Sequence, residues 1–247
     1  MNSQKNPWEE LKGQNYFEKD KEIIDEHNAS LGPHPLFIDL DLLPEPYIGN
    51  PNANVVILFT NPGLRNGGDA EREDYNNDNL VTAIRNNLTH SNKEYPYYYL
   101  NPEFKETGGG KWIRQRMKDL IDDPRIGDKT LSERIFAIQL HPYHSARFKN
   151  IEGLEGQTYS MHLLSKAINR GALIIFTRTQ KEWDDAYYKF DSKFKELKQI
   201  PELNFIELKN TANKTPRSPY FKESMGKENF EKLIAAILKP VDRNGME

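Results

Sequence analysis

The sequence predicts an α/β fold, a three-layer α/β/α domain around a mainly parallel four-stranded sheet. Four short apolar runs, rich in β-branched and aromatic residues, alternate with segments that have helical periodicity. Each run is apolar at consecutive positions, which is typical of parallel strands buried on both faces. No linker, repeat or change in composition divides the 247 residues. One domain covering residues 1–247 is therefore expected, a length that suits a single large core.

The expected strands lie at 54–60, 134–140, 172–177 and 204–208. A turn-rich segment leads into the first strand, which stops at Asn61-Pro62-Gly63. Pro62 cannot donate a hydrogen bond to a sheet, and Gly63 permits a positive φ. The chain is therefore expected to turn at the carboxyl end of this strand, where open α/β sheets place their ligands.

Helical periodicity predicts a series of helices around these strands. They are expected at 19–27, 80–88, 111–121, 160–170, 181–198 and 228–238. Residues 1–18 are expected to form a loosely ordered lead-in, with Trp8 as one of two anchors. The segment 33–46 is interrupted by prolines and is expected to be extended, and 64–79 reads as a long polar loop. Gly108-Gly109-Gly110 precedes Lys111 but lacks the spacing of a phosphate loop.

Composition limits the classes of function. The chain has 34 basic and 37 acidic residues and a net charge of -3, which argues against a globally basic nucleic-acid binder and leaves a local basic face open. It has no cysteine, so disulfides and thiolate metal sites are excluded. The polar N-terminus lacks an apolar signal region, and no apolar run approaches a membrane span. We expect a cytoplasmic protein without a membrane partner; the sequence indicates no oligomeric state.

Each expected strand ends in polar residues. If the strands are parallel, these residues meet along one edge of the sheet, and converging polar groups in a crevice form a candidate site. The sets are Asn61; Gln139 with His141 and His144; Arg178 with Thr179; and Asn210 with Thr211.

The segment 48–63, Ile-Gly-Asn-Pro-Asn-Ala-Asn-Val-Val-Ile-Leu-Phe-Thr-Asn-Pro-Gly, resembles the first motif of the uracil-DNA glycosylase superfamily. Its Asn-Pro-Gly ending is similar to the mismatch-specific and single-strand-selective branches, in which asparagine replaces a catalytic aspartate. By position, 209–221 corresponds to the second motif, with Asn210 or Ser218-Pro219 as the nearest match. The resemblance covers about residues 45–240.

The resemblance implies a DNA glycosylase that hydrolyses the N-glycosidic bond of uracil or a related damaged base in DNA, without a metal or cofactor. Asn61 would orient the attacking water, and Asn210 or His144 would donate a hydrogen bond to the departing base. Gln139 would read the edge of the base. The remaining substrate-binding candidates are Pro62, Gly63, Tyr75, which would stack on the base, His141, Ser218, and Tyr220, which would enter the duplex.

Two other functions remain open on the sequence. A non-catalytic module that binds nucleic acid or protein fits the acidic net charge and the polar loop at 64–79. The third hypothesis is an α/β enzyme that acts on a free nucleoside or nucleotide. A basic stripe at the edge with Asn61 would favour the glycosylase. A pocket filled by Tyr143 or Phe59 would favour the module, and a small pocket without a basic rim would favour the nucleoside enzyme.

Several of these residues can also be explained by a purely structural role. His141 and His144 lie three apart and could hold a metal, although one is more readily a structural histidine. Arg178 could pair with an acidic residue of a neighbouring loop. Tyr220 could pack in the core under the last helix.

Overall fold

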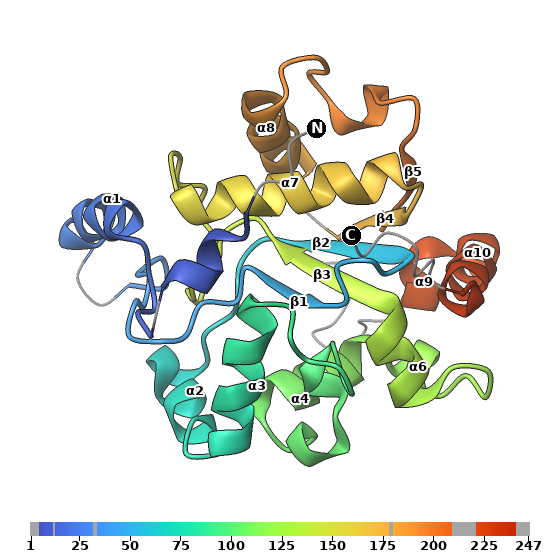
Figure 1. Cartoon of the computed structure of the whole chain (residues 1–247), viewed down its shortest axis with the longest axis horizontal. Helices are drawn as coiled ribbons and strands as arrows, with labels where there is room; N and C mark the ends of the chain where they lie inside the picture. The colour runs from blue at the N-terminus through green and yellow to red at the C-terminus, as the bar shows by residue number, and fades with distance from the viewer. Residues whose placement is uncertain (1–4, 12, 32–33, 178–179, 209–220, 241–247) are drawn as a thin grey trace.

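The computed structural model describes residues 5–11, 13–31, 34–177, 180–208 and 221–240, and it is an α/β protein (Figure 1). A five-stranded mixed sheet in the order β1-β3-β2-β4-β5 forms its centre. The strands are β1 (Tyr47–Gly49), β2 (Val55–Phe59), β3 (Ile135–Gln139), β4 (Leu173–Phe176) and β5 (Asn204–Glu207). The predicted α/β class is confirmed, but the prediction of four strands is wrong, because β1 adds a fifth.

Strand β1 pairs antiparallel with β3, with Tyr47 opposite Ile138. Its three residues follow a proline-rich segment and end at Gly49, so the sequence pattern there indicates a turn. Gly49 has φ 111, and a Cβ at this position would lie 2.5 Å from the carbonyl oxygen of Ile135. A side chain therefore cannot be accommodated where β1 meets its neighbour.

The other three strand pairs are parallel: β2 with β3, β2 with β4, and β4 with β5. Pairing continues beyond the carboxyl ends of β2 and β3. The backbone nitrogen of Leu140 donates to the Phe59 carbonyl (3.0 Å), and that of His141 donates to the Thr60 carbonyl (2.8 Å). The residues that follow both strands are thus held side by side at one edge of the sheet.

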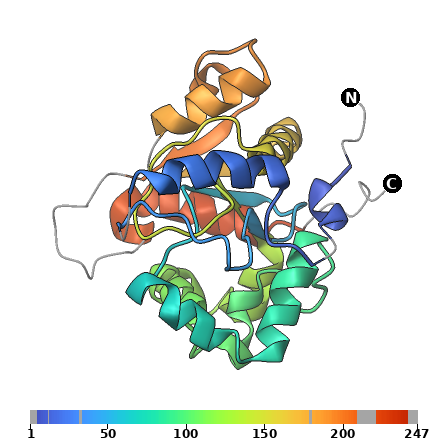
Figure 2. The ribbon, with the colours of Figure 1, turned by 90° about the vertical axis from the view of Figure 1, so that its left-hand side faces the viewer.

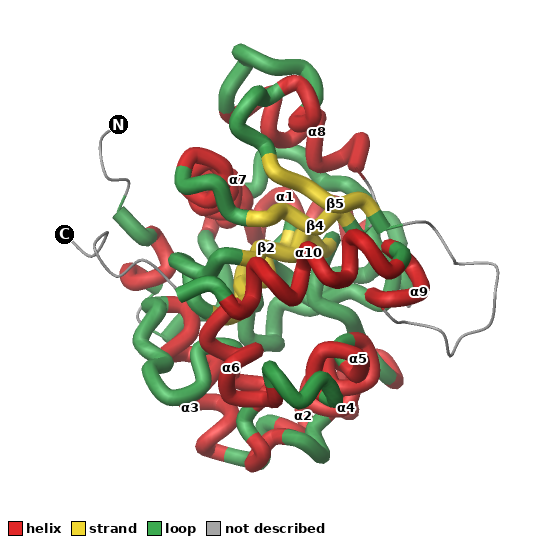
Figure 3. Tube along the Cα trace, turned by 90° about the vertical axis from the view of Figure 1, so that its right-hand side faces the viewer, coloured by secondary structure: helices red, strands yellow, loops and turns green. Residues whose placement is uncertain are grey.

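Helices surround the sheet, and alternate residues of β2 belong to two different hydrophobic clusters. Val56 and Leu58 share a cluster with residues of α1 (Glu18–Ala29), α7 (Glu155–Asn169) and α8 (Gln180–Phe190). Val55 and Ile57 share the other cluster with residues of a second set of helices. This set comprises α3 (Asp78–Leu88), α4 (Gly108–Arg116), α5 (Lys118–Ile121), α6 (Gly127–Arg134), α9 (Phe221–Met225) and α10 (Lys227–Leu238). Figures 2 and 3 show the helices arranged around the sheet.

Three predicted segments differ in the structure. The helix expected at 111–121 is two helices, α4 and α5, because Met117 (φ -106, ψ 18) interrupts it. The helix expected at 181–198 ends at Phe190, and the side chain of Asp191 accepts a hydrogen bond from the Lys193 backbone, which forms a turn. The polar loop contains a short acidic helix, α2 (Asp69–Asp74), whose first-turn carboxylates favour its N-terminus.

The N-terminal segment is docked in its described part. Trp8, in a short 3₁₀ helix (Pro7–Glu10), is 2% exposed and lies in the first hydrophobic cluster. The Asn6 side chain donates to the carbonyl of Leu88 (2.7 Å). Trp8 is therefore a core residue rather than an anchor for a loose segment. Among the helices that the structure describes, none combines the length and apolarity needed to cross a bilayer.

Candidate functional site

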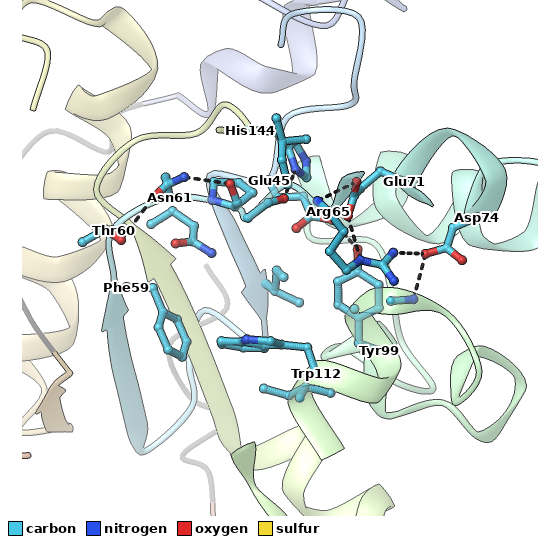
Figure 4. Close-up of a pocket in the computed structure, with 18 of the residues that line it drawn as sticks. Glu45, Phe59, Thr60, Asn61, Arg65, Glu71, Asp74, Tyr99, Trp112 and His144 are labelled. Atoms are coloured by element: carbon cyan, nitrogen blue, oxygen red, sulfur yellow. Dashed lines mark hydrogen bonds and ion pairs between the residues drawn. The ribbon is translucent and has the colours of Figure 1, made fainter. Parts of the chain in front are cut away.

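A pocket of about 290 Å³ lies at the carboxyl ends of β2 and β3, against α2 and α4 (Figure 4). This volume is at the lower end for small-molecule sites. Six of the residues predicted from the sequence line it: Asn61, Pro62, Gly63, Tyr75, Gln139 and His144. The predicted Asn210, Ser218 and Tyr220, like Arg178 and Thr179, lie outside the described residues.

The side-chain amide of Asn61 is fixed by its nitrogen. Nδ2 lies within hydrogen-bonding distance of the Pro62 carbonyl (2.8 Å), the Ser145 carbonyl (2.9 Å) and the Ser145 hydroxyl (3.0 Å). The carbonyl oxygen Oδ1 accepts one hydrogen bond, from the Thr60 hydroxyl (3.2 Å). An amide oxygen has two lone pairs, so Oδ1 can accept a second hydrogen bond from a water or ligand. The sequence predicts a turn after Asn61 in which Gly63 could adopt a positive φ. In the structure the φ of Gly63 is not positive.

Gln139 ends β3 and lines the same pocket. The residue is 7% exposed, and its Oε1 is buried without a hydrogen-bond partner among the described residues. The backbone nitrogen of Gln139 donates to the Pro46 carbonyl (2.9 Å), so β3 is held beside the segment that leads into β1. A buried amide with an unmatched acceptor is rare in proteins and is explained most directly by a ligand that supplies the donor.

Aromatic side chains form another wall of the pocket. The rings of Phe59 and Trp112 pack edge to face with centroids 5.5 Å apart (Figure 4). Trp112 is 40% exposed, and the Arg116 guanidinium lies 5.5 Å from its ring centroid. The sequence pattern places Trp112 on the apolar face of its helix, but here it offers a flat surface at a pocket. Such a surface can stack against a planar heterocycle.

A buried carboxylate, Glu45, also lines the pocket. The hydroxyls of Tyr98 (2.8 Å) and Tyr99 (2.6 Å) both donate to its Oε1. Burial and the neighbouring Glu45 charge raise the pKa of both tyrosines well above the usual range, so both remain donors. The sequence offers one signal for Glu45: it is a lone charged residue between two prolines in an otherwise apolar segment, 42–48.

Arg65 is neutralised within the lining of the pocket. Its Nε pairs with Glu71 (2.9 Å), and its terminal nitrogen pairs with Asp74 (2.9 Å). Asp74 also accepts a hydrogen bond from the Gly108 backbone (2.8 Å), at the N-terminus of α4. The helix terminus and the arginine are therefore both occupied by protein carboxylates (Figure 4).

The glycine triplet before α4 is explained by close packing around this pocket. A Cβ at Gly108 would meet the Arg65 guanidinium at 1.7 Å, and one at Gly109 would meet the Tyr99 ring at 2.2 Å. These two glycines line the pocket. Their lack of a side chain lets Arg65 and Tyr99 lie directly on the helix backbone.

The side chain of His144 bridges two backbone segments. Its Nδ1 faces the Gly63 carbonyl (3.0 Å), and its Nε2 faces the Leu43 carbonyl (3.1 Å). A neutral imidazole has one N–H and satisfies one of these acceptors, whereas the protonated ring satisfies both. Neither ring nitrogen is free to donate to a ligand, as the predicted catalytic role would require.

His141 is not among the residues that line the pocket. It is buried, and its Nε2 accepts a hydrogen bond from the Ile151 backbone (3.2 Å) and lies 3.2 Å from Oδ1 of Asn150.

Tyr143 does not fill the pocket, since its hydroxyl donates to Asp20 (2.7 Å) in the core. Within the described residues, no three His, Cys, Asp or Glu side chains are grouped to hold a metal ion.

We expect the fold to lose stability in acid through His141. Burial lowers its pKa from 6.5 to about 4, so the unfolded chain takes up a proton first. The stabilisation is complete above pH 6.5 and is lost as the pH falls toward 4, by on the order of 2 kcal/mol at pH 4.5. Melting curves between pH 7.5 and 4.5 should show a smaller loss for His141→Gln than for the wild type.

Other groups, among them His90 and Asp20, also contribute to the acid dependence, and all of them are common to the two proteins being compared. His90 has its pKa lowered to about 4 by burial and acts in the same direction as His141. Burial raises the pKa of Asp20, so its protonation acts in the opposite direction. The difference between the two proteins therefore isolates His141, and parallel pH profiles would contradict the prediction.

No family model, no curated protein and no solved structure matches this chain. The case for a function therefore comes from the geometry of the pocket and from the resemblance of residues 48–63.

Proposed function

We propose that the pocket binds a single nucleobase and that the protein is a DNA glycosylase, which hydrolyses the N-glycosidic bond of uracil or a related damaged base. The observation that carries the proposal is the buried side-chain oxygen of Gln139, which has no hydrogen-bond partner among the described residues and lies in the same pocket as the fixed Asn61. The superfamily resemblance of the segment 48–63 and the arrangement of helices around the sheet are consistent with a uracil-DNA glycosylase-like fold.

Asn61 suits the positioning of a water molecule. Its donors are engaged with protein oxygens, which leaves Oδ1 as the atom that accepts a hydrogen bond from the water. An amide does not remove the proton, so it contributes orientation for attack on the anomeric carbon. Asn210, outside the described residues, remains the candidate donor to the departing base.

Gln139 and the aromatic rings of Phe59 and Trp112 would recognise the base. A lactam edge offers one N–H and one carbonyl, which match the two ends of a side-chain amide. Phe59 and Trp112 supply surfaces on which a base taken out of the DNA stack can rest. The acidic lining suits the positive charge that develops on the sugar in an oxocarbenium-like transition state.

A second candidate is hydrolysis of a free nucleoside. It is favoured by one observation, the pairing of Arg65 with Glu71 and Asp74, which leaves this cation of the pocket lining occupied. A site for a phosphodiester chain usually presents basic groups. The segment 209–220 contains Lys209, Lys214 and Arg217 and no acidic residue, and lies outside the described residues.

A base-release assay tests the proposal. Labelled oligonucleotides would carry uracil opposite guanine, opposite adenine or in a single strand, and alkali would cleave the abasic products. Deoxyuridine, followed by chromatography, tests the second candidate. Release from DNA alone supports the glycosylase, release from deoxyuridine alone supports the nucleoside enzyme, and no release from either contradicts both activities toward uracil.

For Gln139→Leu we expect a fall in kcat/KM of about 10- to 100-fold, because the apolar side chain has a similar size but cannot pair with the base. Oε1 of Gln139 has no partner in the part of the chain that the structure describes, so its removal should leave the melting temperature close to that of the wild type. Gln199→Leu is the matched control, since Gln199 is exposed and is not among the residues that line the pocket. Equal rates for the two variants would contradict the role of Gln139.

A further inference from the structure

Glu45 is a carboxylate in the pocket that the hydrolytic step described above does not use. We propose that Glu45 determines base specificity, and that the pocket takes a base with two adjacent N–H donors beside a carbonyl, the pattern of guanine and its oxidised forms. The inference rests on the proposed function in one respect, that the ligand of the pocket is a nucleobase.

The hydrogen bonds of Glu45 leave one of its oxygens available. Both tyrosine hydroxyls donate to Oε1, and the structure shows no hydrogen bond to Oε2 and no cation paired with the carboxylate among the described residues. The side chain is 5% exposed. The unused oxygen is therefore available to a donor group of the ligand, and hydrogen bonds to a charged group are the stronger ones.

Gln139 provides the second acceptor. Two backbone contacts bring the two residues together: Gln139 donates to the Pro46 carbonyl (2.9 Å), and Glu45 donates to the Pro142 carbonyl (2.8 Å). Among the described residues that line this pocket, Oε1 of Gln139 and the hydroxyl of Tyr75 are buried without a hydrogen-bond partner. The terminal torsion of a glutamine is broad, so its amide can turn to present either end to a ligand.

The pocket therefore offers two acceptors and one amide donor to the edge of a base, with the Tyr75 hydroxyl as a further polar group in its lining. Guanine presents a carbonyl oxygen, a ring N–H and an amino group in a row, which matches this set. Uracil and hypoxanthine present one N–H at the corresponding edge, and the neighbouring carbonyl of uracil would face the Glu45 charge. Rejection through a mismatched buried polar group is typically stronger than rejection through a lost apolar contact.

The test compares 2′-deoxyguanosine with 2′-deoxyinosine, which differ only in the amino group. Titration calorimetry, or quenching of tryptophan fluorescence, would measure both dissociation constants for the full chain. We expect the wild type to bind deoxyguanosine at least about tenfold more tightly. In Glu45→Gln the tyrosines still hold Oε1, and an amide nitrogen replaces the free acceptor, so the preference should disappear or reverse.

Glu71→Gln is the matched control. Glu71 lines the same pocket, but its carboxylate is engaged by the side chain and the backbone of Arg65, so the preference should remain. Melting curves of both variants would show that they are folded. Equal binding of the two nucleosides by the wild type, binding of neither, or a preference that survives in Glu45→Gln would overturn the inference.

These outcomes are separate from those of the glycosylase proposal. Selective binding of deoxyguanosine without base release from any substrate would support the inference and contradict the catalytic function. Uracil release without selectivity between the nucleosides would do the reverse. Oligonucleotides that contain 8-oxoguanine or hypoxanthine extend the comparison to DNA, with faster release of 8-oxoguanine as the expected result.

Discussion

Replacement of Asn61 by alanine should lower kcat for base release by at least about 100-fold, with a much smaller change in KM. The amide of Asn61 is held on three protein oxygens, so its own oxygen is placed within narrow limits. Loss of a positioned group of this kind typically costs a factor of about 10² or more, because the water must then find its orientation unaided. Single-turnover rates on the best oligonucleotide substrate measure the effect.

Two further variants make this result specific. Asn76→Ala removes an exposed asparagine that does not line the pocket and should retain the wild-type rate. Ser145→Ala removes one of the three acceptors around Asn61 and should cause an intermediate loss, since the two carbonyls remain. An Asn61→Ala protein that is folded and as active as Asn76→Ala would exclude the assigned role.

Replacement of Gly110 by alanine should strongly destabilise the protein. A Cβ at this position would lie 1.9 Å from the Phe104 carbonyl oxygen, which is backbone and cannot rotate away. Either α4 or the preceding turn must therefore move, and with α4 the pocket wall formed by Trp112. We expect a cost of about 3 kcal/mol, equivalent to a fall in melting temperature of about 6–12 °C.

Gly63→Ala is the control for this stability prediction. Gly63 has no positive φ, and a Cβ there would have no atom within 4 Å. Its melting temperature should stay within about 2 °C of the wild type, because neither strain nor a clash is introduced. A Gly110→Ala protein that melts with the wild type would show that the space beside Phe104 is larger than the structure indicates.

The sequence predicted the parts of the fold that depend on local pattern. The apolar run at β2 and its stop at Asn61 were visible because a strand buried on both faces is apolar throughout. Strand β1 was not predicted, because three residues that end at Gly49 are too few to show the alternating pattern of a strand. Its pairing also depends on a neighbour about 90 residues away in the sequence. The break at Met117 is likewise a property of packing rather than of propensity.

The same limit applies to the candidate site. Asn61 and Gln139 could be predicted because each follows or ends a recognisable strand and therefore reaches one edge of the sheet. The position of Glu45 between two prolines singles it out, but its contacts could not be predicted, because they are made with tyrosines more than 50 residues later in the chain. The ion pairs of Arg65 with Glu71 and Asp74 depend on the short helix α2. The sequence did not predict this helix, because the polar composition of the segment indicated a loop.

The position of β2 has a consequence for synthesis on the ribosome. Both of its neighbours in the sheet come later in the chain, since β3 begins at Ile135 and β4 at Leu173. At translation rates of about 5–20 residues per second, β2 waits about 4–16 seconds for its first partner. During that time a nascent chain carries the apolar segment Val55–Phe59 without a sheet to join. This strand is therefore an apolar segment of the nascent chain to which a chaperone would be expected to bind.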